Sequence, residues 1–395
     1  MTRSLPMLAT ASPIASRPHV EPVAADVLTE LQTLGVRWQS AGGPGLSRAG
    51  VAGPSDHKAI VLDGQTLMVP IFTHASSQSP FVARVGADGK RAVLTRAGRF
   101  IGEVTFPNTP RFYELFTQDG TPYWKIARLH ASDVLATTVL QTCVRYGHRS
   151  TSCQFCAIGQ SLAAKQTIAE KTPEQLAEVA AAAVHLDGVK HVVMTTGTPK
   201  TLDRGASVLA SAARAIKASV DVPIQAQCEP PDDFAWFERL RDAGVDTLGM
   251  HLEAVGEEVR RRIMPGKAEV PVSFYFEAFE SAVRVFGRGQ VSTYLLAGLG
   301  DSAEALLDAS ERLITLGVYP FVVPFVPIAH TPLEHHPTPD AAFLRRVLDG
   351  VADQLGHAGM SASSIKAGCG RCGACSSLRA REPRAAQERS AHGAA

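Results

Sequence analysis

Three of the seven cysteines in this 395-residue chain lie in one short stretch, at positions Cys143, Cys153 and Cys156. Thiolates are soft ligands, and they select zinc, copper(I) or iron–sulfur clusters over hard cations. If three thiolates hold a four-iron cluster, one iron keeps no protein ligand and can bind a substrate or a cofactor. Two alternatives fit the same residues: a zinc ion with His148 as its fourth ligand, and a redox dithiol formed by Cys153 and Cys156.

A second group of three cysteines, Cys369, Cys372 and Cys375, is interleaved with glycines near the end of the chain. Glycine weakens a packed core but lets the backbone turn closely around a metal, so this spacing indicates a second metal site. An auxiliary iron–sulfur cluster and a structural zinc ion are both open, and the sequence shows no fourth ligand. Cys228 is a candidate only if the fold brings its strand to this segment, and is otherwise a buried free thiol.

The overall composition argues against several classes of protein. The net charge is +1 and 19% of the residues are charged, so neither nucleic acid nor an anionic membrane is expected as the main partner. No apolar run reaches about 18 residues, so no membrane-spanning helix is expected. Cysteines clustered in a long chain are typical of metal sites in a reducing compartment, and we therefore expect a cytoplasmic protein.

The elements that must position these cysteines alternate between strands and helices from Asp133 onward. Such βα units predict a parallel sheet whose active site lies at the carboxyl ends of the strands. Six strands are two short of a closed eight-stranded barrel, so we expect an α/β fold with an open partial (βα)6 TIM-like barrel. The expected strands cover residues 134–140, 191–196, 223–228, 247–253, 291–297 and 319–326.

The remaining chain predicts further parts around this barrel. Short alternating runs separated by Asp-Gly pairs at 63–64, 88–89 and 119–120 indicate tight hairpin turns, and so a small β-rich domain. Apolar spacing over 23–42 predicts one helix that ends at the glycine pair 42–43. The expected organisation is a flexible N-terminus (1–22), an N-terminal helix plus β-rich domain (23–132), the partial barrel (133–335), a C-terminal helix and Cys-rich segment (336–375) and a disordered tail (376–395).

The pattern Cys…Cys-x-aromatic-Cys after a strand, followed by about six βα units, resembles the radical S-adenosylmethionine (radical SAM) enzymes. Within them it is most similar to a biotin-synthase-like branch, an uncharacterised one associated with nitrilase-containing gene clusters. The resemblance covers roughly residues 133–335 and implies a [4Fe-4S] cluster on Cys143, Cys153 and Cys156, with S-adenosylmethionine (SAM) on the open iron. Reductive cleavage of SAM would then give a 5′-deoxyadenosyl radical that abstracts hydrogen from a small-molecule substrate. The first cysteine gap holds nine residues where the family usually has three, a length found in outlying members.

The resemblance also implies cofactor contacts near the first cysteines and the second strand. Phe155 matches the aromatic residue that packs near the adenine. Thr196 and Gly197 occupy the turn that usually meets the methionine amino group, although the acidic residue of that turn is missing here. A helix cap and turn is the alternative role for this pair.

Further contacts are implied at the ends of later strands. Glu253 is expected to hold the ribose hydroxyls, with an ion pair to an arginine of 260–262 as the alternative, and His251 is a second candidate beside it. Glu229 could contact the nucleotide or the substrate, or act as a cap. Gly298 lies in a Gly-x-Gly turn that resembles the family's turn near the adenine, although such a turn alone is common.

The implied partners are a small-molecule substrate and an electron donor such as flavodoxin or ferredoxin, and a homodimer remains open. Two functions from other classes compete with this interpretation. One is a zinc-binding α/β-barrel protein with structural cysteine sites, and the other is an iron–sulfur electron-transfer protein without a substrate. A carrier needs no nucleotide site, so Glu253 and Phe155 argue against the second.

Overall fold

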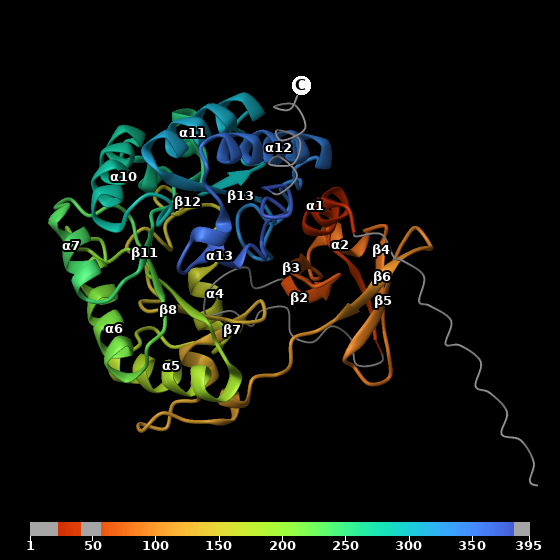
Figure 1. Cartoon of the computed structure of the whole chain (residues 1–395), viewed down its shortest axis with the longest axis horizontal. Helices are drawn as coiled ribbons and strands as arrows, with labels where there is room; N and C mark the ends of the chain where they lie inside the picture. Colours follow the sequence, from red (N-terminus) through yellow and green to blue (C-terminus); the bar gives the residue numbers. More distant parts are fainter. Residues whose placement is uncertain (1–22, 41–56, 383–395) are drawn as a thin grey trace, which may run out of the picture.

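The computed structural model describes residues 23–40 and 57–382, and the expectation for residues 1–22 lies outside this part of the chain. A small β-sheet domain packs beside a larger α/β domain, whose helices surround a curved sheet (Figure 1). No helix of the described residues is long and apolar enough to cross a membrane.

The small domain folds around a six-stranded sheet in the order β1-β4-β5-β6-β2-β3. The Asp63-Gly64 pair forms the turn between β2 and β3, with φ angles of 49° and 73° that suit such residues. The pair at 88–89 lies between β4 and β5, and the third pair lies in a turn outside this sheet. The strands are β1 (Arg37–Gln39), β2 (His57–Leu62), β3 (Gln65–Pro70), β4 (Phe81–Val85), β5 (Arg91–Arg96) and β6 (Arg99–Thr105).

The first helix, α1 (Ala25–Leu34), is shorter than the sequence predicted. It ends at Gly35, which has a φ of 68°, and the short strand β1 follows where helix was expected. A side chain at Gly35 would lie 2.4 Å from the carbonyl oxygen of Pro70, so the chain must turn here with glycine. The expected helix end at 42–43 lies outside the described residues.

The larger domain confirms the predicted α/β class. Its sheet contains six parallel strands in chain order, β8 to β13, and β7 (Arg128–His130) pairs antiparallel at the edge beside β8. The sequence analysis did not predict β7, whose residues it placed in the N-terminal domain. The parallel strands are β8 (Val134–Thr138), β9 (His191–Thr195), β10 (Ile224–Gln227), β11 (Thr247–Gly249), β12 (Val291–Ala297) and β13 (Val318–Pro324).

The helices between these strands form the outer layer. Helix α5 begins with a capping box, in which Thr172 and Gln175 bond each other's backbone, and it ends at Gly188. The long helices are α5 (Pro173–Asp187), α6 (Ala206–Ser219), α7 (Ala235–Asp242), α10 (Val272–Phe286), α11 (Ala303–Leu316) and α12 (Ala341–His357). The short ones are α2 (His74–Ser77), α3 (Tyr123–Ile126), α4 (Ile158–Ala163), α8 (Glu257–Ile263), α9 (Pro265–Ala268) and α13 (Cys369–Cys372), with 3-10 turns at Arg111–Glu114 and Ala362–Ser364.

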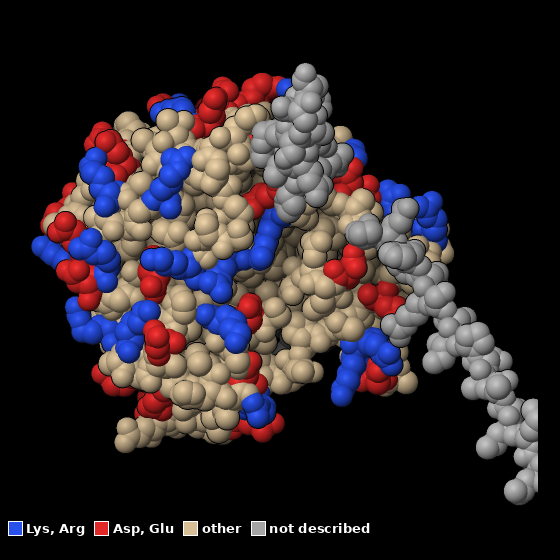
Figure 2. Space-filling view, in the orientation of Figure 1, with Lys and Arg blue, Asp and Glu red and all other residues tan. Residues whose placement is uncertain are grey.

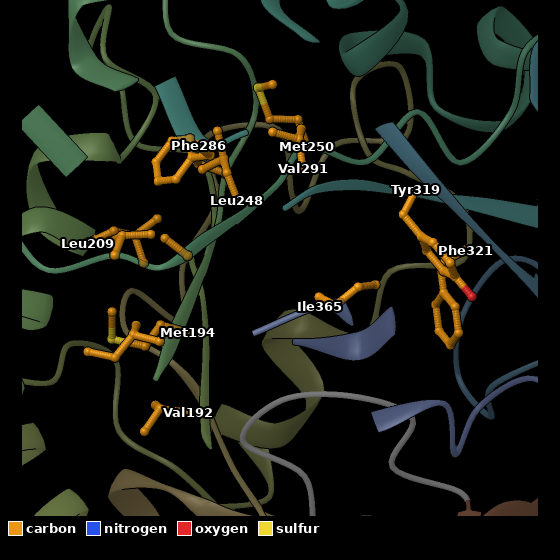
Figure 3. Close-up of a cluster of buried hydrophobic side chains, with 14 of the residues drawn as sticks. Val192, Met194, Leu209, Leu248, Met250, Phe286, Val291, Tyr319, Phe321 and Ile365 are labelled. Atoms are coloured by element: carbon orange, nitrogen blue, oxygen red, sulfur yellow. The ribbon is translucent and has the colours of Figure 1, made fainter. Parts of the chain in front are cut away.

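The main core lies between the sheet and this helical layer. Val192 and Met194 of β9 and Leu248 of β11 are fully buried there with Leu209 of α6 (Figure 3). Alternate residues of a strand point to opposite faces, so the intervening positions point into the barrel. His191, which binds the C-terminal segment, is one of these interior residues.

The C-terminal segment corrects one prediction. Residues 376–382 were expected to begin a disordered tail, yet Ser376, Ser377, Leu378 and Arg381 are buried. Arg381 is 1% exposed and donates to Asp26 of α1 at 2.9 Å, so it joins this segment to the small domain. The rest of the expected tail, 383–395, lies outside the described residues.

Candidate functional site

The loop that follows β8 carries the first cysteine group at the carboxyl end of the sheet. Val144 donates to the carbonyl of Thr198 at 2.8 Å, which ties the start of the loop to the segment after β9. Gln154 donates to the carbonyl of Ile263 at 2.8 Å, and a tight turn joins the amide of Cys156 to the carbonyl of Cys153 at 3.0 Å. All three cysteines of the loop are partly exposed.

The long gap between Cys143 and Cys153 is held by an ion pair. Arg145 donates to both carboxylate oxygens of Glu229, at 3.1 and 2.9 Å, and Thr198 donates to the same carboxylate at 2.7 Å. The side chains of Arg145 and Glu229 are only 15% and 8% exposed, so this fork is a strong contact between the loop and the end of β10. Glu229, expected as a ligand contact or a cap, therefore also positions the cysteine loop.

Burial opposes the ionisation of Glu229, but the bonds from Arg145 and the charge of Lys267 outweigh it. They hold the pKa of the Glu229 carboxyl below its ordinary value. The carboxylate is thus charged at neutral pH, and the fork with Arg145 persists there.

Gly197 sits where no other residue fits. Its amide donates to the carbonyl of Leu140 at 2.8 Å, and a Cβ at this position would lie 2.0 Å from the carbonyl oxygen of Thr142. The Thr196 hydroxyl donates to the Gly197 carbonyl at 2.8 Å. The two residues thus pack the turn after β9 directly against the base of the Cys143 loop.

Glu253 adopts a conformation that is unusual for its residue type. Its φ is 65°, in the left-handed region where residues other than glycine are uncommon, and such strain concentrates at functional sites. Its carboxylate accepts from Lys267 at 2.7 Å, with the two side chains 15% and 10% exposed. The ion-pair partner is therefore Lys267, and not an arginine of 260–262. Arg260, of that group, donates to backbone carbonyls, including that of Leu252 at 2.8 Å.

Burial alone would lower the pKa of Lys267. The charges of Glu253, Tyr275 and Glu229 outweigh burial and raise the Lys267 pKa above its ordinary value. Lys267 is thus a permanent cation beside the cysteine loop. The sequence analysis missed it, because one lysine in a short helix gives no local signal.

His251 is held between two neighbours inside the barrel. Its Nδ1 accepts from the Tyr294 amide at 3.2 Å, and its ring stacks on that of Tyr294 with centroids 4.3 Å apart. Burial, and then the charge of Lys267, lower the His251 pKa to about 3, so the ring is neutral and its Nε2 carries the proton. This Nε2 is buried and has no partner among the described residues. A buried donor without an acceptor is costly, and a bound molecule could supply the acceptor.

Phe155 lies in a small apolar cluster near the ends of β12 and β13. It packs with Met264, Leu299 and Phe325, and Cys153 contacts the same cluster. This places an aromatic wall beside the cysteine loop.

Gly298 forms the expected tight turn, with a φ of 114°. Its carbonyl lies 2.9 Å from Nε2 of His336, and a Cβ here would lie 3.1 Å from Pro339. The segment after β13 therefore covers this turn, and Gly298 is required for that close packing.

The thiols of Cys153 and Cys156 are uncharged at neutral pH unless a cation stabilises their thiolates. Burial, and then the charge of Glu253, raise the pKa of Cys153, and burial raises the pKa of Cys156 to about 11. A metal that binds here must displace these protons. The neighbouring Lys267 and Arg145 lower the cost of a negatively charged thiolate site.

A cluster fits this donor set better than a single ion does. A zinc ion with Zn–S bonds of about 2.3 Å holds its sulfurs roughly 3.8 Å apart. Within residues 23–40 and 57–382, no three His, Cys, Asp or Glu side chains converge in a way that could hold one metal ion. His148, the proposed fourth zinc ligand, is exposed and bonds Ser150 instead. A larger iron–sulfur core needs more widely separated thiolates.

Cys228 does not join either cysteine group. It follows β10, where Gln225 and Gln227 face the interior and contact Cys369. Cys228 has the opposite orientation and is buried with Ala226 in the core under the helices. It is therefore a buried free thiol, the alternative that the sequence analysis left open.

A comparison with family models matches part of the larger domain. Residues 147–313 match the model described as the radical SAM superfamily. The matched region contains Cys153 and Cys156 and begins four residues after Cys143. This superfamily uses an iron–sulfur cluster to cleave SAM, so the match supports a [4Fe-4S] cluster and SAM as cofactors.

Several known proteins are similar to parts of the chain. Bacteriochlorophyllide c C-7(1)-hydroxylase from Chlorobaculum limnaeum is 31% identical over 135 residues, which is 34% of this chain and 33% of that protein. The chain thus matches about one third of that relative's length. Methylornithine synthase has a similar structure over 63% of this chain and 68% of its own, at 17% identity and a TM-score of 0.44. A radical SAM methyltransferase from Sphaerobacter thermophilus covers 71% and 76%, at 16% identity and a TM-score of 0.43.

Proposed function

We propose that this protein is a radical SAM enzyme that acts on a small molecule. Cys143, Cys153 and Cys156 would hold a [4Fe-4S] cluster through three irons and leave the fourth for SAM. In this superfamily the reduced cluster supplies one electron for cleavage of the sulfonium, and the resulting 5′-deoxyadenosyl radical abstracts hydrogen from the substrate. The observation that carries the proposal is the three-thiol loop at the carboxyl end of a parallel sheet, within and beside the matched region.

The side chains around this loop suit a bound nucleoside. Phe155 and its apolar neighbours offer a wall for the adenine. Glu253, held by Lys267, can accept from the two ribose hydroxyls. Thr196 and Gly197 lie against the base of the loop, where the methionine amino group is expected.

Two buried side chains, His251 and Lys267, are suited to orient a bound molecule and to balance the charge of the thiolates. The Nε2–H of His251 is a neutral donor without a partner among the described residues, so it can bind an acceptor on the cofactor or the substrate. Lys267 keeps its proton at neutral pH and balances the negative charge of the thiolates. Neither group needs to transfer a proton for hydrogen-atom abstraction.

The narrower assignment follows from the resemblance alone. We propose a biotin-synthase-like branch associated with nitrilase gene clusters, acting in the cytoplasm on a small nitrogenous metabolite. Flavodoxin or ferredoxin would supply the electron. A zinc-binding barrel protein and an iron–sulfur carrier are the competing functions. Phe155 in its apolar cluster, and the His251 donor without a partner among the described residues, argue against a simple carrier.

The test is the release of 5′-deoxyadenosine from SAM by protein purified without oxygen and reduced with dithionite. The wild-type protein should release it, and Cys156→Ala should release none. Cys228→Ala removes a thiol that lies outside both groups and is the matched control, which should keep the wild-type rate. Zinc without sulfide after iron–sulfur reconstitution, or equal product from Cys156→Ala, would overturn the proposal.

A further inference from the structure

The C-terminal segment closes the amino end of the barrel. The amide of Gly368 donates to Nδ1 of His191 at 3.1 Å, and Thr247 donates to the carbonyl of Ala367 at 3.0 Å. His191 and Thr247 are the first residues of β9 and β11, so the segment enters at the ends of the strands opposite the first cysteine group. Figure 1 shows α13 within the ring formed by the strands and helices.

Interior polar side chains then meet the first thiol of this segment. Cys369 donates its amide to Gln225 at 3.1 Å, and its sulfur accepts from Nε2 of Gln227 at 3.3 Å. The Tyr294 side chain also hydrogen-bonds to Cys369. Amide and phenol donors aimed at a sulfur are the contacts that stabilise a metal-bound thiolate.

The glycines between the cysteines allow this close arrangement. A Cβ at Gly370 would lie 2.7 Å from the end of the Ile365 side chain and 3.1 Å from Tyr319, so any larger residue would displace this packing. Gly373 has a φ of 70°, which turns the chain between Cys372 and Cys375. The three thiols are thereby brought close enough to interact electrostatically with one another.

A histidine from a distant strand completes the group. His130 ends β7, and its Nε2 lies 3.6 Å from the sulfur of Cys375, although 245 residues separate the two in sequence. A metal with bonds of about 2.3 Å to sulfur and about 2.05 Å to nitrogen places two such ligands roughly 3.6 Å apart. His130 thus supplies the fourth ligand that the sequence did not reveal.

A path for a metal to enter lies beside the group. A cavity of about 630 Å³ lies between the two domains and is lined by Cys372, His191 and Arg371. The surface in Figure 2 is hollowed between the domains, and basic side chains border the hollow. An entry path and four suitable ligands are what a metal site requires.

We propose that Cys369, Cys372, Cys375 and His130 are the four ligands of a second metal centre. It takes an iron–sulfur cluster, because no three His, Cys, Asp or Glu side chains of the described residues converge as the ligands of a single zinc ion would. Four protein ligands leave no open position, so this centre does not bind the substrate. It holds the C-terminal segment in the barrel or carries electrons.

The segment that carries the proposed centre also contacts the small domain. Ala374, between two of the ligands, accepts from the Met68 amide at 2.8 Å and from the Gln32 side chain at 2.9 Å. Thr29 and Ser377 share a hydrogen bond of 2.7 Å. A metal at this place therefore fixes both domains to the same segment.

The test uses the full chain with Cys143, Cys153 and Cys156 all changed to alanine, so that its result is independent of the proposed function. The protein is purified without oxygen and reconstituted either with iron and sulfide or with zinc, and metal and sulfide per chain are measured. Retained iron with matching sulfide supports the centre. Retained zinc without sulfide, or the absence of bound metal, overturns it.

Ligand variants in the same background test the named residues. Cys375→Ala and His130→Ala should each reduce bound metal at least tenfold, whereas Cys228→Ala should leave it unchanged. His130→Cys offers a fourth thiolate and should retain the metal with a shifted absorption spectrum, which separates loss of a ligand from loss of folding. Unchanged metal in His130→Ala would remove His130 from the centre.

Discussion

The two cysteine groups of this protein contact the same sheet and differ in what surrounds them. The first group lies on a loop beside two ion pairs, Arg145 with Glu229 and Glu253 with Lys267. In the second group, the sulfur of Cys369 lies among neutral donors, the amide of Gln227 and the Tyr294 phenol. In the first group, the exposed His148 bonds Ser150, whereas in the second His130 lies 3.6 Å from the sulfur of Cys375.

This difference indicates different tasks. Charged groups that are already fixed in place can stabilise a bound ion or a change in charge without rearranging, which suits a site where SAM binds and is cleaved. Neutral donors around a closed ligand set stabilise a metal that stays in place. The comparison therefore assigns chemistry to the carboxyl end of the barrel and anchoring or electron transfer to the amino end.

The largest expected effect separates the two groups by activity. Cys153→Ala should abolish 5′-deoxyadenosine formation, because the SAM-binding cluster loses one of only three ligands. Cys372→Ala should keep a measurable rate, at least a tenth of the wild type, with the first cluster intact. Complete loss in Cys372→Ala with unchanged iron at the first group would contradict this division of tasks. The measurement is product released per minute, with iron per chain determined on the same samples.

The next effect concerns the ion pair that only the first group has. Lys267→Met leaves the nearly buried carboxylate of Glu253 without its partner, so the free energy of unfolding should fall by about 3 kcal/mol. Adding Glu253→Gln should restore much of that loss, because no unpaired charge then remains. Urea unfolding of the single and double variants measures both values. If Lys267→Met and the wild type unfold with equal free energy, the Lys267–Glu253 ion pair does not contribute to stability.

A smaller effect is expected where the loop is anchored. Arg145→Lys keeps the positive charge but loses the bidentate contact with Glu229. This should weaken the binding of the loop to the end of β10 by roughly 1.4 kcal/mol, which is tenfold in an equilibrium constant. Iron of the first group should therefore pass to a chelator about ten times faster. Metal of the second group should leave at the wild-type rate and serves as the internal control. Equal acceleration at both groups would indicate general loosening of the fold.

A further effect is a dependence of stability on pH near the end of β8. Lys171 is buried, its amine donates to the carbonyl of Thr138 at 2.7 Å, and burial lowers its pKa to about 7. The unfolded chain, where this pKa is near 10.5, binds more protons between about pH 7 and 10.5, so this group makes stability rise with pH in that window. Lys171→Met should remove that rise. Unfolding of both proteins at pH 7, 8.5 and 10 measures the difference, and identical pH profiles would refute it.

The sequence predicted the parts of this fold that local patterns determine. The six parallel strands are apolar runs, and the ends of α5 carry a capping box and a glycine that any such helix needs. The candidate metal ligands were recognisable because cysteine spacing is itself the signal. These features depend on residues close together in the chain.

Contacts between distant segments could not be predicted in the same way. Arg145 and Glu229 are 84 residues apart, and His130 and Cys375 are 245 apart, so no local pattern connects them. Lys267 lies in a four-residue helix and gained significance only when the fold placed it beside Glu253. The tail at 376–382 has a polar composition typical of disorder, but the buried Arg381 pairs with Asp26 in the small domain and Asp349 in the larger one.

The most direct test of the account is the electron paramagnetic resonance spectrum of the reduced protein with and without SAM. The account predicts that the cluster held by Cys143, Cys153 and Cys156 has one open iron, so SAM should change its spectrum. In Cys375→Ala, where only this cluster should remain at about four irons per chain, the same change should occur. A spectrum that saturating SAM leaves unchanged, in protein that retains those four irons, would contradict the central claim.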